Sequence, residues 1–159
     1  DKLCAGITDY AIKITRLRIS DQEHEDVARL LQVVSDIERV GDYCENISEF
    51  AEEMAENKLT FSETGELELK EMIEVCADSY EYAIQAFMEN DKEKALKVIE
   101  KEKRADELEV SLRTKHIKRL TNQECNTEAG IVFLDTVICL ERISDHARNI
   151  AEEVIEHTA

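Results

Sequence analysis

The sequence has no proline and no tryptophan, and only four of its 159 residues are glycine. Proline and glycine are the residues that most often interrupt helices, so almost nothing in this chain does so. Aromatic residues contribute 5% of the chain, whereas apolar residues as a whole reach 43%. This composition is typical of an all-α bundle with a real core. We expect one helical domain, or two small halves that share a core.

Basic residues are also few: the chain has 20 of them against 37 acidic residues, which gives a net charge of −17. Such a surface repels nucleic acid, so we expect no nucleic-acid partner. The five cysteines are scattered without any CxxC pair. This excludes a zinc ribbon or a disulfide framework and indicates reduced, cytoplasmic thiols. No apolar run approaches 20 residues, so the chain as given does not cross a membrane.

One acidic phrase is written twice in this chain. Residues 38–49 read ERVGDYCENISE, and residues 141–152, which lie 103 positions later, read ERISDHARNIAE. Six of the twelve positions are identical. A repeat of this kind predicts two copies of one structural unit.

Periodicity and capping signals predict five helices. The start signals are Ser20 with Glu23, Asn90 with Glu93, and, more weakly, Thr121 with Glu124. The clearest break is residues 58–64, which separates a first unit, 1–58, from a second unit, 65–157. The second unit holds three helices and the first holds two, so a helix equivalent to the first of the second unit is missing before Asp1. The predicted helices cover about residues 2–18, 20–57, 65–89, 90–120 and 127–157.

An apolar stripe turns acidic midway along three of these helices. Positions i and i+4 lie nearly in line on a helix, so each E-xxx-D pair presents two carboxylates on one face. These pairs are Glu38 with Asp42, Glu102 with Asp106, and Glu141 with Asp145. A short loop places the last two pairs side by side on neighbouring helices.

Carboxylates lined up between packed helices need protonation, a basic partner or a bound cation. Arg39 and Arg142 each follow the Glu by one residue and so point about 100° away from it, and Arg104 is similarly misplaced. We therefore predict a metal site. Ligand oxygens without Cys or His favour iron, manganese, magnesium or calcium over zinc. Asn46 and Asn149, which recur in both copies, are predicted to orient the carboxylates.

The phrases ERVGDYCENI and ERISDHARNI resemble the E(D)xxxD signature of PhoU-like proteins, phosphate-transport regulators built from two three-helix repeats. Residues 126–153 and 20–53 are most similar to the PhoU domain at the cytoplasmic C-terminus of bacterial sodium/phosphate cotransporters. The absence of proline favours that branch over the free-standing proteins. The resemblance implies a metal-binding regulatory domain at the inner face of the cell membrane, with Glu38, Asp42, Glu102, Asp106, Glu141 and Asp145 as ligands. In the ungapped register Leu3 stands opposite Asp106, and Asp1 supplies that ligand only after a two-residue shift.

The resemblance further implies, as partner, the transmembrane part of a phosphate transporter in the same chain, or separate transport or sensor proteins. A homo-oligomer is compatible with either. Three alternatives stay open. The first is a free-standing PhoU-type regulator, and the second is a metal-free helical adaptor. The third, a di-iron oxidase, is disfavoured because none of the four histidines follows a Glu by three residues, and no catalytic residue is predicted.

Overall fold

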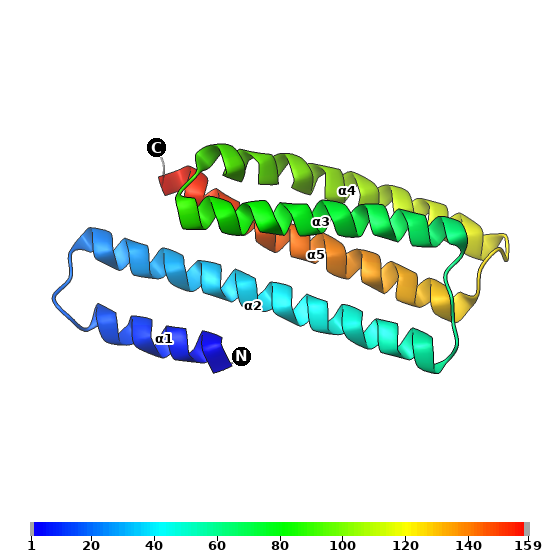
Figure 1. Ribbon diagram of the computed structural model, residues 1–159, viewed down its shortest axis with the longest axis horizontal. Coiled ribbons are helices and arrows are strands. Elements are labelled where there is room, and N and C mark those ends of the chain that lie inside the picture. The colour runs from blue at the N-terminus through cyan, green and yellow to red at the C-terminus, as the bar shows by residue number, and fades with distance from the viewer. Residues whose placement is uncertain (1, 158–159) are drawn as a thin grey trace.

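The computed structural model describes residues 2–157, and every regular element in that range is an α-helix (Figure 1). The predicted all-α bundle is confirmed. The helices are α1 (Lys2–Thr15), α2 (Asp21–Glu56), α3 (Glu63–Glu89), α4 (Lys92–Thr121) and α5 (Thr127–His157). None of these described helices is long and apolar enough to cross a bilayer.

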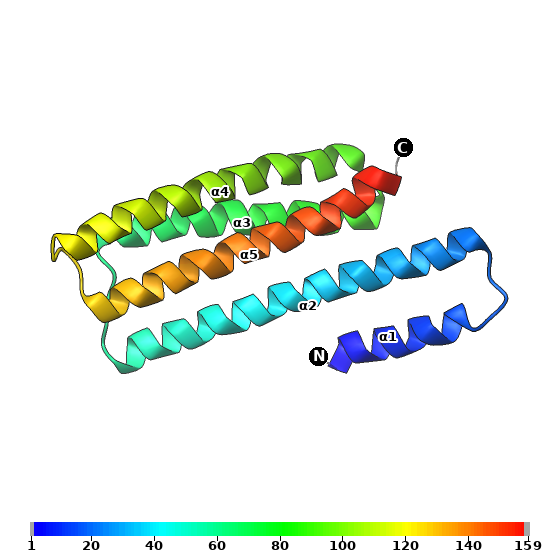
Figure 2. The same ribbon diagram turned by 180° about the vertical axis from the view of Figure 1, so that it is seen from behind.

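The last three helices form an up-down-up bundle in which each packs against the other two. Helix α2 runs antiparallel to α5 and packs along it, while α1 folds back onto α2 (Figures 1 and 2). Among the described helices α1 contacts α2 alone, and it covers only the first half of that helix. The two copies of the repeated phrase lie on α2 and α5, so they sit on helices that touch.

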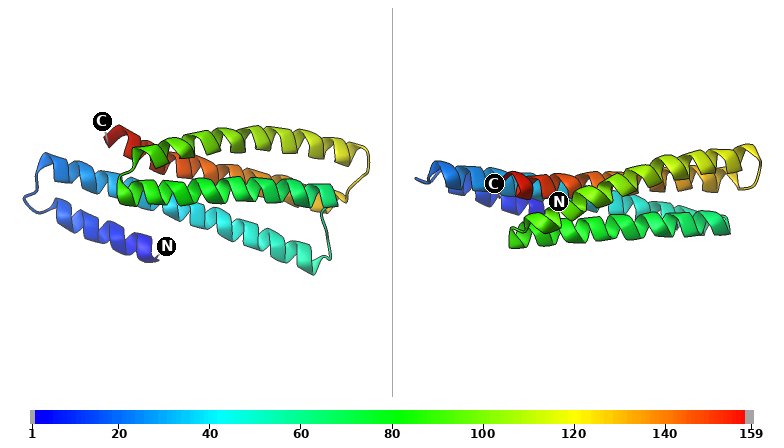
Figure 3. Two further views of the ribbon diagram at one scale, coloured as in Figure 1. Left: turned by 45° about the horizontal axis from the view of Figure 1, so that its top comes forward. Right: turned by 90° about the horizontal axis from the view of Figure 1, so that it is seen from above.

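The core has two parts along the length of the bundle. At one end, large side chains such as Phe133, Met72 and Leu112 fill the space between α3, α4 and α5. At the other end the buried residues are mostly small, and alanines on α3, α4 and α5 let the helix backbones approach closely. Figure 3 shows α3 and α4 lying closer together at one end than at the other. The small-residue cluster consists of Val33, Ala83, Ala86, Ala95, Val98, Ala147, Ile150, Ala151 and Val154.

Side-chain caps set most helix starts. Ser20 and Glu23 form the predicted capping box, in which the Ser20 N–H donates to Glu23 Oε2 at 2.7 Å and the Glu23 N–H donates to Ser20 Oγ at 3.3 Å. Ser62 caps α3 by accepting from the Gly65 N–H. These caps satisfy backbone donors that have no partner within the helix.

Two predicted start signals were wrong. Asn90 does not cap α4, because it adopts the left-handed conformation (φ 52°, ψ 44°) and ends α3 instead. Asn tolerates that conformation better than most residues. Asp91 is the true cap, and its Oδ1 accepts from the N–H groups of Glu93 and Lys94. Thr121 belongs to the last turn of α4.

The start of α5 is held by Asn126 rather than by Thr121 with Glu124. Asn126 Oδ1 accepts from the N–H groups of Glu128 at 2.8 Å and Ala129 at 3.1 Å. The linker between α2 and α3 falls at residues 57–62, which overlaps the predicted break. The division into units 1–58 and 65–157 remains a prediction.

Candidate metal centre

Three predicted ligands meet where α4 and α5 pack together. Glu102 and Asp106 lie one turn apart on α4, and Asp145 faces them from α5. Each offers a carboxylate oxygen, and the three oxygens lie within 4.8 Å of one another. Residues about 40 positions apart in the sequence are therefore brought together by the antiparallel packing of two helices joined by a short loop.

Glu141, one turn before Asp145, adds a fourth carboxylate beside this group. It is half-buried, and its pKa is raised by burial and then by the charge of Asp145. Asp106 and Glu109 raise it further, while Arg142 lowers it. These causes place Glu141 within electrostatic reach of the cluster, although its oxygens do not belong to the tight group of three.

Burial and neighbouring carboxylates disfavour the ionised form of Asp106. The pKa of Asp106 lies above its ordinary value because of partial burial and then because of Glu102 and Asp145. Arg148 opposes this effect without cancelling it. A raised carboxyl pKa means that the ionised form is disfavoured here, so the site favours either a proton or another positive charge.

The donor set fits one hard cation. Two oxygens that share an ion at about 2.0–2.4 Å each lie at most about 4–5 Å apart, and the three carboxylates satisfy this. No thiol or imidazole belongs to the group, which favours magnesium, calcium, manganese or iron over zinc. Glu102, Asp106 and Asp145 would hold the ion, and Glu141 lies close enough to add its charge.

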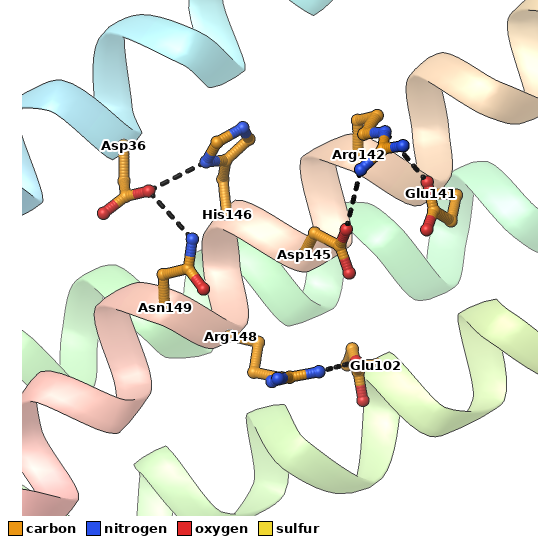
Figure 4. Close-up of polar contacts among 8 residues, drawn as sticks. All are labelled: Asp36, Glu102, Glu141, Arg142, Asp145, His146, Arg148 and Asn149. Carbon is orange, nitrogen blue, oxygen red and sulfur yellow. Dashed lines mark hydrogen bonds and ion pairs between the residues drawn. The ribbon is translucent and has the colours of Figure 1, made fainter.

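The expectation that Arg39 and Arg142 point away from the carboxylates was wrong. Arg142 reaches both Glu141 (3.5 Å) and Asp145 (3.4 Å), and Arg148 Nη1 donates to Glu102 Oε1 at 2.6 Å (Figure 4). An arginine is long enough to fold back along its own helix or to cross to the next one, so the 100° offset of its Cα does not exclude contact. Arg142 and Arg148 thus neutralise part of the negative charge of these carboxylates.

Arg104 does point away, toward α3, where it pairs with Glu71 at 2.7 Å. The other predicted pair, on α2, is less organised. Asp42 pairs with Arg39 at 3.6 Å, with both side chains about half exposed. Glu38 lines an apolar groove of about 260 Å³ between α1 and α2, together with Leu3, Cys4, Ile7, Val34 and Ile37. Within residues 2–157 no third carboxylate joins Glu38 and Asp42 to form such a group. Asp1 lies outside the described residues.

A second polar cluster lies at the α2–α5 seam, and sequence reasoning missed it. Asp36 is 2% exposed. Its Oδ1 accepts from His146 Nδ1 at 2.8 Å and from Asn149 Nδ2 at 3.1 Å (Figure 4). Its Oδ2 accepts from Gln32 Nε2 at 3.1 Å. Asn149, predicted to orient the carboxylates of its own helix, therefore binds a carboxylate on α2.

His146 also stacks on Tyr43, with ring centroids 5.9 Å apart. Asn46, the counterpart of Asn149, is exposed. The only sequence signal for the seam was the recurrence of asparagine in both copies of the phrase. Asp36 itself precedes the first copy of the phrase, and the equivalent position before the second copy is Cys139.

Comparison with known proteins places the chain in a family. The PhoU domain family matches residues 1–51 and 69–154. The chain is 31% identical over 129 residues to the phosphate-specific transport system accessory protein PhoU homolog 1 of Thermotoga maritima, covering 81% of this chain and 55% of that protein. It is 26% identical over 151 residues to the corresponding PhoU homolog of Streptococcus pneumoniae, covering 91% of this chain and 68% of that protein. The match to the Thermotoga relative therefore spans little more than half of that protein's length.

Solved structures support the same fold. The crystal structure of PhoU from Pseudomonas aeruginosa superposes with a TM-score of 0.90 at 23% identity, covering 99% of this chain and 75% of that one. The phosphate transport system regulatory protein PhoU from Streptococcus pneumoniae gives a TM-score of 0.82 at 22% identity, covering 98% and 73%. At these identities the likeness establishes the helical arrangement.

Proposed function

Because the chain belongs to the PhoU domain family, we propose that it is a PhoU-type regulator of phosphate transport that holds a hard metal ion between α4 and α5. The named relatives are accessory and regulatory proteins of phosphate transport systems, so the proposed role is control rather than catalysis. The observation that carries the metal part is the convergence of Glu102, Asp106 and Asp145 within 4.8 Å.

The comparisons favour a regulator of the phosphate-specific transport system over a domain of a sodium/phosphate cotransporter. Both curated relatives described above are named as accessory proteins of the former system. Phosphate uptake by cells that lack the gene for this chain tests the role. We expect the deletion to change the phosphate dependence of uptake, and the wild-type gene to restore it. Uptake that is identical with and without the gene would contradict the regulatory role.

The choice of transporter is tested by repeating the uptake assay in sodium-free medium. If the chain acts on the phosphate-specific transport system, its effect on uptake persists without sodium. If the effect disappears with sodium, the cotransporter hypothesis is correct instead. The same two strains, with and without the gene, are compared in both media, so only the sodium content differs between the two comparisons.

The metal part is tested on purified protein by elemental analysis after dialysis. We expect bound manganese or iron in the wild type and loss of most of it in the double variant D106N/D145N. The matched control is E71Q/E107Q, which removes two charges from the exposed carboxylates around Arg104 on α3 and α4. A wild type and a D106N/D145N variant with equal metal content would overturn the assignment and favour the metal-free adaptor.

A further inference from the structure

Arg148 holds two carboxylates at once. From α5 its Nη1 donates to Glu102 Oε1 at 2.6 Å, and its Nε donates to Glu152 Oε1 at 2.9 Å. Figure 4 shows the guanidinium lying in the space between α5 and Glu102 on α4. Arg148 thus joins a member of the carboxylate cluster to a residue one turn along its own helix.

The two carboxylates differ in their need for a partner. Glu102 is 4% exposed, whereas the Glu152 side chain is about half exposed and is solvated. A buried carboxylate without a counter-charge is costly, so Glu102 must hold Arg148, another cation or a proton. An exposed pair such as Arg148 with Glu152 gains little, because water screens it. The guanidinium of Arg148 therefore reaches two carboxylates, Glu102, which needs it strongly, and Glu152, which needs it weakly.

We propose that Arg148 is a tethered counter-ion that competes with the metal for Glu102 and withdraws to Glu152 when a divalent cation is held. This inference rests on the proposed metal binding. Glu102 has two oxygens, but a guanidinium and a metal ion held by one buried carboxylate repel each other, so each weakens the binding of the other. The cluster therefore has an internal cation in the metal-free protein, which protects the fold and weakens metal affinity.

The arginine sets a threshold for metal occupancy. Metal binding must first break a charge-assisted hydrogen bond, and removing that competitor frees Glu102 for the ion. Charged hydrogen bonds of this kind correspond to about a tenfold to hundredfold change in an equilibrium constant. Glu152 acts in the opposite direction. It now accepts from Arg148 Nε alone, and after withdrawal it also becomes the partner for the N–H group that Glu102 releases, so it stabilises the withdrawn position more than the present one.

Calorimetric titration of metal-free protein with Mn²⁺ tests the inference. We expect R148Q to tighten the Kd about tenfold to hundredfold and E152Q to weaken it. R104Q, the matched control, removes the same charge from an exposed arginine on α4 that pairs with Glu71, and should change the Kd little. Metal-free R148Q should melt below the wild type, and Mn²⁺ should raise its melting temperature by more than it raises that of the wild type.

The outcomes separate this inference from the function it rests on. If D106N/D145N abolishes Mn²⁺ binding while R148Q leaves the Kd unchanged or weakens it, Arg148 is only a structural partner of Glu102 and the inference is overturned. If neither the wild type nor any variant binds Mn²⁺, the proposed metal site is wrong. Should R148Q fail to fold, E152Q decides, since tighter or unchanged binding in that exposed variant contradicts the competition.

Discussion

The seam between α2 and α5 depends on one buried carboxylate, and Asp36→Ala tests how much. Asp36 comes from α2, and two of its donors, His146 and Asn149, come from α5. Because a carboxylate oxygen only accepts, His146 donates from Nδ1. The substitution leaves both donors at a half-buried seam with nothing to bind, while Gln32 returns to water.

The magnitude follows from these contacts. A hydrogen bond to a charged group contributes about 1.5–3 kcal/mol, and breaking a buried pair from one side costs about 3–5 kcal/mol. Loss of the carboxylate also removes its own desolvation penalty, so we expect a net loss of about 2–4 kcal/mol. For a chain of this size each kcal/mol lowers the melting temperature by roughly 2–4 °C, which gives a drop of about 4–16 °C.

Urea unfolding followed by circular dichroism, in chelator, measures the change. The matched control is Asp26→Ala on the same helix, where an exposed carboxylate lies 3.8 Å from Arg29. We expect the control to stay within about 0.5 kcal/mol of the wild type. A double-mutant cycle with Asn149→Ala should give a coupling of about 1 kcal/mol. If D36A and D26A unfold at the same urea concentration, Asp36 does not hold the seam and the argument fails.

Three further predictions concern ionisation. Burial, and then the charge of Arg119, lowers the pKa of His116; the unfolded state therefore binds its proton first, and stability should fall by up to about 1.4 kcal/mol per pH unit as pH drops below 6.5. Urea midpoints at pH 8 and pH 5 measure this, and H116Q should show a smaller difference. The raised pKa of Asp106 affects stability in the opposite direction. Its contribution to the free energy of unfolding is fully present below the pKa of the unfolded state and is lost as pH rises through the pKa of the folded state. D106N should therefore raise the melting temperature in chelator at pH 7 and have little effect near pH 3.5. Burial raises the pKa of Cys76 to about 12, so in the folded protein an alkylating reagent should label exposed Cys44 and spare Cys76, as peptide mass spectrometry would detect.

Local rules predicted the helices well, because proline is absent and the apolar spacing is regular. They failed at junctions where two residues compete for one role. Asn90 and Asp91 are adjacent and both are good caps, but Asn90 also tolerates the left-handed conformation that ends α3. The chain uses each for a different helix. A single sequence does not decide between these uses.

The site was predictable only where its geometry is local. The E-xxx-D spacing fixes two carboxylates on one face, and the short α4–α5 connection brings two such faces together. The role of Asp36 could not be predicted from the sequence, because its α5 partners are more than 100 residues away. A single Asp on an acidic helix is usually a solvated surface residue. The arginines were misjudged because helical angles describe where a side chain starts, and a guanidinium ends several ångströms further on.

The two halves of the repeat are not equivalent as metal sites within the described residues. On α5, Asp145 meets two carboxylates from α4, whereas on α2 the pair Glu38 and Asp42 meets an apolar groove and Arg39. A single E-xxx-D pair brings two carboxylates to an ion, whereas three converge between α4 and α5, so the pair supplies less of the negative charge and fewer of the oxygen ligands that a hard ion prefers. We therefore expect the double variant E38Q/D42N of this chain to keep most of its bound manganese.

That comparison needs protein loaded and dialysed under one protocol, with manganese counted per chain by elemental analysis. Because E38Q/D42N and D106N/D145N each remove two negative charges, a general electrostatic attraction for cations would lower the count equally in both. Local coordination lowers it only in D106N/D145N. Equal losses in the two variants would mean that the acidic surface, and not the convergence of α4 with α5, holds the metal.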